Sequence, residues 1–190
     1  MTEFLPWMNL QAVRFYGRLL QPNTRVLELG AGKSTIWLGR HGLEVIAYEH
    51  DESWANEVND WITEYGLSNV EVITASDGPA DLISQHPPES FDIVVIDGID
   101  RFKCCEEILK HEILKKGGWL IYDDIHRRYF DEDYVEAYAL LDGWGHEIIG
   151  FGNHRNYDEW KLLVDAMGEV APMVAQAPYE QTLFAQRPQH

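Results

Sequence analysis

The sequence has few cationic side chains. Lysine and arginine together number 15 against 32 aspartate and glutamate residues, and the formal net charge at pH 7 is −17. Proteins that bind nucleic acids neutralise phosphates with lysine and arginine, and a strongly acidic protein repels a polyanion. A local basic pair such as Arg127-Arg128 does not reverse that field. The composition therefore predicts that neither DNA nor RNA is the substrate, and it favours a small-molecule partner.

Cysteines and long apolar runs are scarce as well. The two cysteines, Cys104 and Cys105, are adjacent, so they form neither an ordinary disulfide framework nor a zinc site by themselves. No stretch approaches the roughly 18 apolar residues that a membrane span needs. The first six residues lack the basic and then apolar pattern of a signal peptide. We therefore expect a cytoplasmic protein with no membrane partner.

The length of 190 residues suffices for one domain with a complete core and is short for two. The hydrophobic fraction of 45% and the charged fraction of 25% are those of a globular protein. We place the domain at residues 1–167, including an N-terminal helical segment at 1–24, and treat residues 168–190 as a C-terminal extension or the last strand. For that extension a tail, a lid and a homodimer contact are open alternatives.

Short apolar runs rich in β-branched residues alternate with helical patterns along the chain. Strands that are apolar on both faces and alternate with helices indicate a parallel sheet covered on both sides, and right-handed crossovers then give a doubly wound α/β fold. Residues 160–164 and 182–185 both resemble a final strand. The expected strands are 26–29, 45–48, 70–73, 91–96, 119–122 and 147–151, and the expected helices are 10–20, 34–40, 52–65, 80–85, 102–115 and 134–141.

A glycine-rich turn, residues 28–35, ends the first expected strand. Gly30 and Gly32 permit a sharp turn and a close approach of the backbone to a ligand, and the following helix offers free N–H groups. A phosphate-binding P-loop would need its first glycine at Leu27, inside an apolar strand, so the P-loop is excluded. A dinucleotide-binding fingerprint needs its third glycine at Thr35, which weakens the prediction of an NAD- or NADP-dependent oxidoreductase without removing it.

An acid, Glu49, ends the second expected strand, 19 residues after Gly30. One crossover helix and one strand would bring it beside the glycine turn. A carboxylate at this place accepts hydrogen bonds from both hydroxyls of a ribose, each worth roughly 1.5–3 kcal/mol. The spacing therefore predicts a nucleoside-binding site.

Over roughly residues 25–151, the order of these features resembles the class I S-adenosylmethionine-dependent methyltransferases. In that family an acid at the strand end precedes Gly-x-Gly, as Glu28 precedes Gly30 and Gly32 here. The resemblance implies a Rossmann-like fold with a mostly parallel seven-stranded sheet whose last strand is antiparallel, and S-adenosyl-L-methionine as cofactor. It implies cofactor contacts from Glu28, Gly30, Ala31, Gly32, Ser34, Thr35, Glu49, His50, Ser76, Asp77 and Asp97.

Acidic residues also follow the fourth and fifth expected strands, Asp97 after one and the pair Asp123-Asp124 after the other. Parallel strands end at one edge of a sheet, so these residues are candidates to converge beside the glycine turn. At ~4 Å and an effective dielectric constant near 20, each pair of carboxylates repels by about 4 kcal/mol, so a cluster requires a proton, a cationic partner or a metal ion. The alternative is that they cap helices or meet solvent, and in a regular strand Asp123 and Asp124 point to opposite faces.

The same positions resemble the ligands of cation-dependent O-methyltransferases of the catechol, caffeoyl and macrocin types. This resemblance implies Mg²⁺ or another divalent cation on Asp97, Asp123 and Asp124, lowering the pKa of the acceptor hydroxyl. In a metal-free enzyme Asp97 would orient the substrate and His126 would act as general base. We therefore predict O-methylation of a small hydroxylated molecule, with an NAD(P)-dependent oxidoreductase and a non-catalytic nucleotide-binding module as alternatives.

Overall fold

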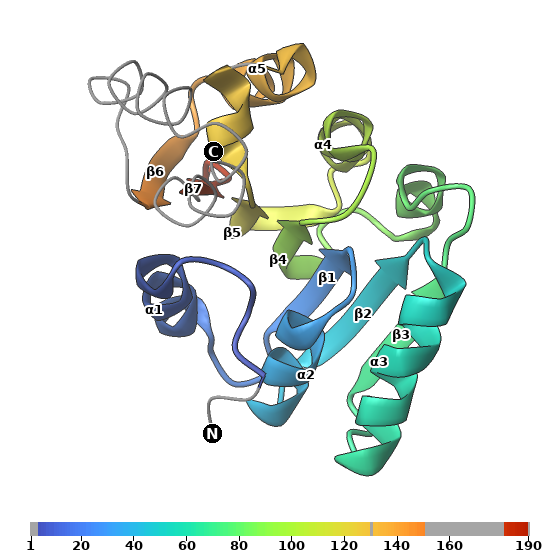
Figure 1. Cartoon of the computed structure of the whole chain (residues 1–190). Helices are drawn as coiled ribbons and strands as arrows, with labels where there is room; N and C mark the ends of the chain where they lie inside the picture. Colours follow the sequence, from blue (N-terminus) through green and yellow to red (C-terminus); the bar gives the residue numbers. More distant parts are fainter. Residues whose placement is uncertain (1–3, 130, 151–180, 190) are drawn as a thin grey trace, which may run out of the picture.

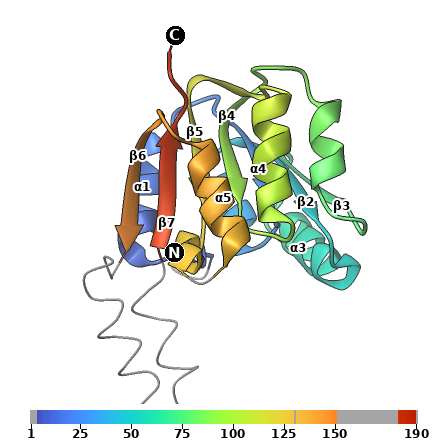
Figure 2. The same ribbon diagram turned by 90° about the horizontal axis from the view of Figure 1, so that it is seen from above.

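The computed structural model describes residues 4–129, 131–150 and 181–189. Its centre is a seven-stranded sheet in the order β3-β2-β1-β4-β5-β7-β6. The strands run parallel except for β7, which is antiparallel to both of its neighbours, and in Figure 2 its arrow points opposite to that of β6. The predicted fold is confirmed. The strands are β1 (Arg25–Leu29), β2 (Glu44–Glu49), β3 (Val70–Thr74), β4 (Phe91–Ile96), β5 (Leu114–Tyr122), β6 (Gly145–Gly150) and β7 (Gln181–Gln186).

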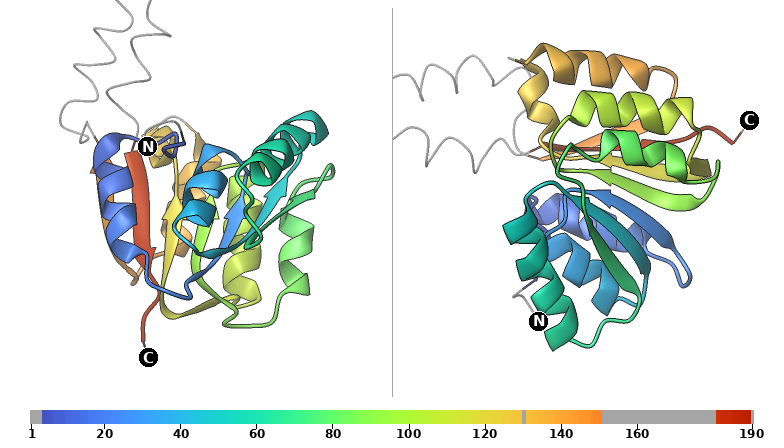
Figure 3. Two further views of the ribbon diagram at one scale, coloured as in Figure 1. Left: turned by 90° about the horizontal axis from the view of Figure 1, so that it is seen from below. Right: turned by 90° about the vertical axis from the view of Figure 1, so that its right-hand side faces the viewer.

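Helices cover both faces of the sheet, three on one side (α1, α2 and α3) and the rest on the other (Figures 1 and 3). Separate apolar cores fill the two interfaces, because the central strands are buried on both faces. Within the described ranges, none of the helices has the length and apolar character needed to cross a bilayer. The helical elements are α1 (Leu10–Leu19), α2 (Lys33–Arg40), α3 (Glu52–Glu64), η1 (Ala80–Gln85), α4 (Arg101–Lys110), η2 (Ile125–Tyr129) and α5 (Glu132–Leu140), of which η1 and η2 are 3₁₀ helices.

The helix predicted at 102–115 was too long, since α4 ends at Lys110. Glu112 adopts a left-handed backbone conformation with φ of 51°, and Leu114 then pairs with Phe91 as the first residue of β5. Residues 116–118, which separated the expected helix from the expected strand, lie within β5 at an irregularity in its pairing with β4. Helix propensity in this segment was overridden by pairing with a strand distant in sequence.

The last strand of the sheet is β7, which contains residues 182–185, one of the two segments that resembled a final strand. The other, residues 160–164, lies outside the described residues. Because β7 lies between β5 and β6, the end of the chain forms part of the sheet. We call the edge at which the parallel strands end the carboxyl edge, and the opposite one the amino edge.

Candidate cofactor and acceptor site

The glycine turn after β1 packs directly against the turn after β4. Gly30 has φ of +113°, and a Cβ atom there would lie 2.6 Å from the amide nitrogen of Gly98. The Asp97 amide donates to the Leu29 carbonyl at 2.9 Å, which fixes the contact. Only glycine fits at position 30, both for its backbone conformation and for the space. Gly98 was not singled out from the sequence, although it directly follows a predicted site residue.

Glu28 lies fully buried beneath the glycine turn. The Thr35 hydroxyl donates to its Oε2, and Thr35 in turn accepts from the Gly32 amide at 2.8 Å. Burial raises the pKa of Glu28 to about 7, against the lowering effect of hydrogen bonds from Ser34 and Thr35, and Glu49 raises it further. Its Oε1 has no hydrogen-bond partner among the described residues. Ser34 and Thr35, predicted as cofactor contacts, thus support this buried carboxyl group.

Glu49 ends β2 beside the glycine turn and is 5% exposed. Its Oε2 accepts from the Ala31 amide at 3.1 Å, and its Oε1 accepts from the Asp51 amide at 2.9 Å. The Nδ1 atom of the more exposed His50 lies 2.8 Å from the same Oε1. The end of β2 therefore places the Glu49 carboxylate beside the glycine turn, where the sequence predicts an acid that binds a ribose.

Ser76 and Asp77 lie exposed in the loop after β3. The next residue, Gly78, has φ of +96°, and a Cβ atom there would lie 2.7 Å from Oδ2 of Asp100. This loop therefore borders the loop that follows β4. Both segments belong to the carboxyl edge, so the predicted cofactor contacts Ser76 and Asp77 lie near the turns described above.

Two tryptophans, Trp7 and Trp54, lie beside the glycine turn, and neither was predicted as a site residue. Trp54, in the first turn of α3, donates from Nε1 to the Ala31 carbonyl at 2.7 Å. Trp7 stacks on Trp54 with ring centroids 5.9 Å apart and is itself 64% exposed. The amino group of Lys33 lies 5.4 Å from the Trp7 ring centroid. The turn is thus held from outside by α3 and the N-terminal segment.

Three carboxylates meet at the ends of β4 and β5, and we call Asp97, Asp123 and Asp124 the acidic cluster. One ligand atom from each lies within 4.8 Å of the other two. The strand ends at Tyr122, and Asp124 takes a left-handed conformation with φ of 58°. Because regular strand geometry ends at Tyr122, Asp123 and Asp124 are no longer held on opposite faces of the sheet.

Asp123 is the most buried member of the acidic cluster, at 5% exposed, whereas the Asp97 and Asp124 side chains are 27% and 31% exposed. Burial raises the pKa of Asp97 well above its usual range, and Asp123 adds to the effect. Burial, followed by the charge of Asp124, raises the pKa of Asp123 to about 7. The hydroxyl of Thr182, from β7, donates to Asp123 at 2.5 Å and opposes this rise. Thr182 was not predicted as a site residue, and it lies 59 residues from Asp123 in the sequence.

A cation also reaches the acidic cluster. Arg101, the first residue of α4, places Nη2 3.2 Å from Oδ1 of Asp97 and 3.4 Å from Oδ2 of Asp124. Its side chain is 11% exposed. Arg101 was not predicted as a site residue, although it follows Asp97 by four residues and directly precedes a predicted helix. A carboxylate cluster was predicted to require a proton, a cationic partner or a metal ion, and Arg101 is such a cationic partner.

His126 lies in η2 at the border of the acidic cluster. Its Nδ1 is 3.9 Å from Oδ1 of Asp124 and accepts a long hydrogen bond, 3.4 Å, from the Gln181 amide. Its side chain is 18% exposed. The predicted general base, His126, therefore lies near the carboxylates. Its Nδ1 is the nitrogen near Asp124, and the same atom accepts from the Gln181 amide of β7.

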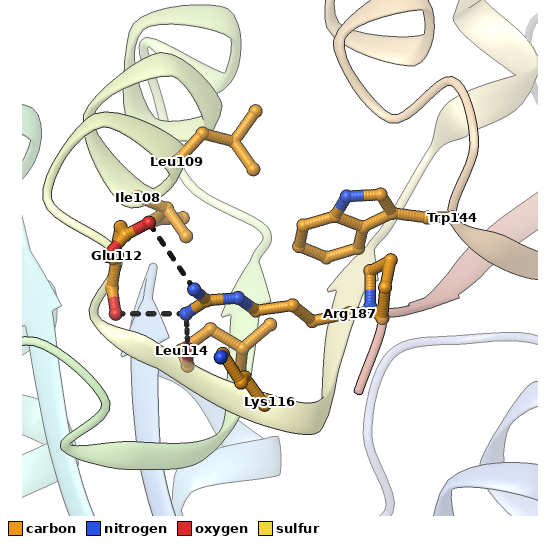
Figure 4. A pocket seen from close by; sticks show the side chains of 8 residues that line it. Ile108, Leu109, Glu112, Leu114, Lys116, Trp144 and Arg187 are labelled. Atoms are coloured by element: carbon orange, nitrogen blue, oxygen red, sulfur yellow. Dashed lines mark hydrogen bonds and ion pairs between the residues drawn. The ribbon is translucent and has the colours of Figure 1, made fainter. Parts of the chain in front are cut away.

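A separate cavity of about 230 Å³ lies at the amino edge. It is lined by the end of α4, the start of β5, Trp144 before β6 and the segment after β7, and Figure 4 shows the Arg187 side chain extending past Trp144 toward Glu112. Arg187 donates to the Glu112 carbonyl at 3.2 Å and pairs with the Glu112 carboxylate at 3.5 Å. None of the predicted site residues lines this cavity.

A family model described as a methyltransferase domain matches residues 27–125, more than half of the chain. The match spans β1 to the start of η2, and so includes the glycine turn, Glu49 and the acidic cluster. A search of curated proteins found no match.

Solved structures share the whole fold at low sequence identity. An rRNA methylase from Streptococcus thermophilus is 17% identical with a TM-score of 0.62, and the alignment covers 93% of each chain. A precorrin-6y C5,15-methyltransferase from Geobacter metallireducens is 14% identical with a TM-score of 0.60, covering 99% of this chain and 92% of the other. A SAM-dependent methyltransferase from Archaeoglobus fulgidus is 12% identical with a TM-score of 0.55, covering 93% and 91%. At these identities the likeness is one of fold.

Proposed function

The chain belongs to the methyltransferase-domain family and is an S-adenosylmethionine-dependent methyltransferase, and from this premise we propose that it methylates a hydroxyl oxygen of a small molecule. The observation that carries the proposal is the convergence of the acidic cluster at the same edge as the glycine turn. Carboxylates at this place are suited to take the proton that a hydroxyl acceptor must lose.

The glycine turn fits the cofactor. S-adenosylmethionine presents ribose hydroxyls and an ammonium group, which are hydrogen-bond donors, and Glu28 and Glu49 offer buried acceptors there. The unpartnered Oε1 of Glu28 is a group that a bound donor would satisfy. Gly30 leaves no Cβ between the glycine turn and the turn after β4, so the two turns that carry Glu28 and Asp97 can pack directly against each other. We assign the ribose to Glu49, with Ser76 and Asp77 on the adenine side.

The acidic cluster fits a hard divalent cation. Oxygen ligands at ~2.0–2.6 Å from one ion lie within about 5 Å of one another, and the 4.8 Å limit of the cluster meets this condition. Carboxylate oxygens suit magnesium, calcium or manganese. Asp97, Asp123 and Asp124 would hold the cation. When bound, it would supply a positive charge that lowers the pKa of the acceptor hydroxyl.

The chain's own residues provide the rest of the reaction. The new bond joins the acceptor oxygen to the methyl carbon, the sulfur–methyl bond breaks, and S-adenosylhomocysteine leaves with the bonding electron pair. The acceptor proton passes to a carboxylate of the acidic cluster, and Asp97 is the first candidate when no cation is bound, because a raised pKa makes its ionised form a stronger base. His126 is the second candidate base, at the border of the cluster. Alignment of acceptor and methyl group contributes through proximity.

The nicotinamide alternative is not favoured. The third glycine of its fingerprint would stand at Thr35, and the Thr35 side chain is instead committed to Glu28. A nucleic-acid acceptor is the main alternative to a small molecule, since one of the similar solved structures is an rRNA methylase. Our preference for a small molecule is supported by the net charge of −17, which opposes binding to a polyanion.

A methyl-transfer assay on a panel of small phenols and sugars tests the proposal, with and without chelator, and mass spectrometry locates the added methyl group. We expect O-methylated product that diminishes with chelator. Transfer to nitrogen or carbon acceptors only, or sub-micromolar binding of structured RNA at roughly 150 mM salt, would reject the small-molecule hydroxyl as acceptor.

A further inference from the structure

The guanidinium group of Arg101 lies between the two loops that carry the acidic cluster. Its Nε donates to the Gly98 carbonyl at 2.8 Å, and its Nη1 donates to the Asp123 carbonyl at 2.7 Å. Its Nη2 approaches one carboxylate from each loop, those of Asp97 and Asp124. A single side chain therefore binds the backbone after β4 and after β5 together with the acids that follow both strands.

The shape of arginine suits this task better than that of lysine. A guanidinium presents its N–H donors in a rigid planar fork and stays charged, whereas an ammonium is a compact point charge on a flexible stem. Three ionised carboxylates would carry a charge of about −3, and Arg101 reduces it by one unit. The side chain is nearly buried, where a charge requires partners, and the acids supply them.

Arg187 provides an internal comparison, because it is almost as buried, at 14% exposed, but lies at the amino edge. It too binds backbone carbonyls, those of Glu112 and Leu114 (Figure 4). Its acidic partners, however, are exposed, with Glu112 at 64% and Glu89 at 46%. Solvent can screen those acids without Arg187, whereas the acids around Arg101 are 27% and 31% exposed and converge on one point.

We propose that Arg101 is the resident cation of the acidic cluster, a positioning residue that holds Asp97 and Asp124 together with or without a divalent cation. The inference rests on the proposed function only in taking the cluster as a cation site. Without Arg101 the acidic cluster keeps the hydrogen bond from Thr182 and the neighbouring His126, but it loses the buried positive charge that pairs with Asp97 and Asp124. The repulsion between the carboxylates then increases, and an external cation that relieves it stabilises the folded state by mass action.

Thermal unfolding of Arg101→Met, measured in chelator and in manganese, tests this, with Arg187→Met as the matched control. We expect both variants to have a lower Tm in chelator. Manganese should raise the Tm of Arg101→Met by at least ~3 °C more than it raises that of the wild type. The manganese gain of Arg187→Met should equal the wild-type gain, since its acids are exposed and do not converge.

A manganese gain in Arg101→Met no larger than in the wild type, including no gain in either, would overturn the proposal, as would an equal enlargement in Arg187→Met. Should Arg101→Met not fold, Arg101→Gln decides, because it also removes the positive charge but keeps a polar side chain that can hydrogen-bond the loop carbonyls. A gain above that of the wild type supports the proposal and an equal one overturns it. Failure of the proposed function is detected separately, in the wild-type methyl-transfer assay.

Discussion

The carboxyl edge and the amino edge of the sheet house their acidic side chains differently. At the carboxyl edge Glu28, Glu49 and Asp123 are each at most 5% exposed. At the amino edge the Glu44 and Glu112 side chains are 68% and 64% exposed. Burying an acid costs stability unless partners compensate, so one edge carries a cost that the other avoids. We therefore expect ligands to bind at the carboxyl edge rather than at the amino edge.

Two glycines with positive φ offer the largest test of this contrast. Gly30→Ala combines left-handed strain with a Cβ placed against the Gly98 amide, so we expect a loss of roughly 3–5 kcal/mol in the free energy of unfolding. Gly42→Ala, at the amino edge, has φ of +79° but no atom within 4 Å of the added Cβ, so a loss of about 1–2 kcal/mol is expected. Urea denaturation measures both. Equal losses would show that the packing of the turns contributes nothing.

The pH dependence of stability should differ between buried and exposed acids. Glu28 releases its proton near 4.5 in the unfolded chain but only near 7 in the folded protein, because burial raises its pKa. Between these values the folded state binds more protons, so the free energy of unfolding should fall as the pH rises, by up to roughly 3 kcal/mol. Denaturation of the cofactor-free protein across this range measures the fall.

The matched variants separate Glu28 from the other titrating groups. Glu28→Gln should make the profile less steep between about pH 4.5 and about pH 7, leaving the parts contributed by Asp97 and Asp123, whose pKa values are also raised by burial. Glu44→Gln at the amino edge should leave the profile as it is in the wild type. A Glu28→Gln profile as steep as the wild-type profile would contradict the assignment.

Glu44 and Glu49 lie at opposite ends of β2, so substitutions there compare the amino edge with the carboxyl edge within one strand. Glu49→Ala should weaken S-adenosylhomocysteine binding by at least ~10-fold, because one hydrogen bond to a charged group is lost from the ribose site. Glu44→Ala, at the other end of the strand, removes only an exposed pair with Arg25 and should leave the affinity unchanged. Calorimetric titration provides both values, and equal affinities for the two variants would remove Glu49 from the cofactor site.

The sequence predicted the central strands well, because strands buried on both faces of a parallel sheet contain apolar runs, as in residues 93–96 of β4. It also predicted that the acids after β4 and β5 converge, which follows from the parallel topology. The start of β5 was missed, because pairing of Leu114 with Phe91 decides it. Thr182 was missed for a related reason, since only the tertiary fold brings it to Asp123.

The most direct test of the central claim is the binding of manganese to the protein complexed with S-adenosylhomocysteine, followed by electron paramagnetic resonance. The account predicts one bound ion per chain in the wild type, and loss of that ion in Asp124→Ala while the affinity for S-adenosylhomocysteine stays within about 3-fold, because Glu49 and the glycine turn lie on other strands. No bound manganese in the wild type, or undiminished binding in Asp124→Ala, would contradict it.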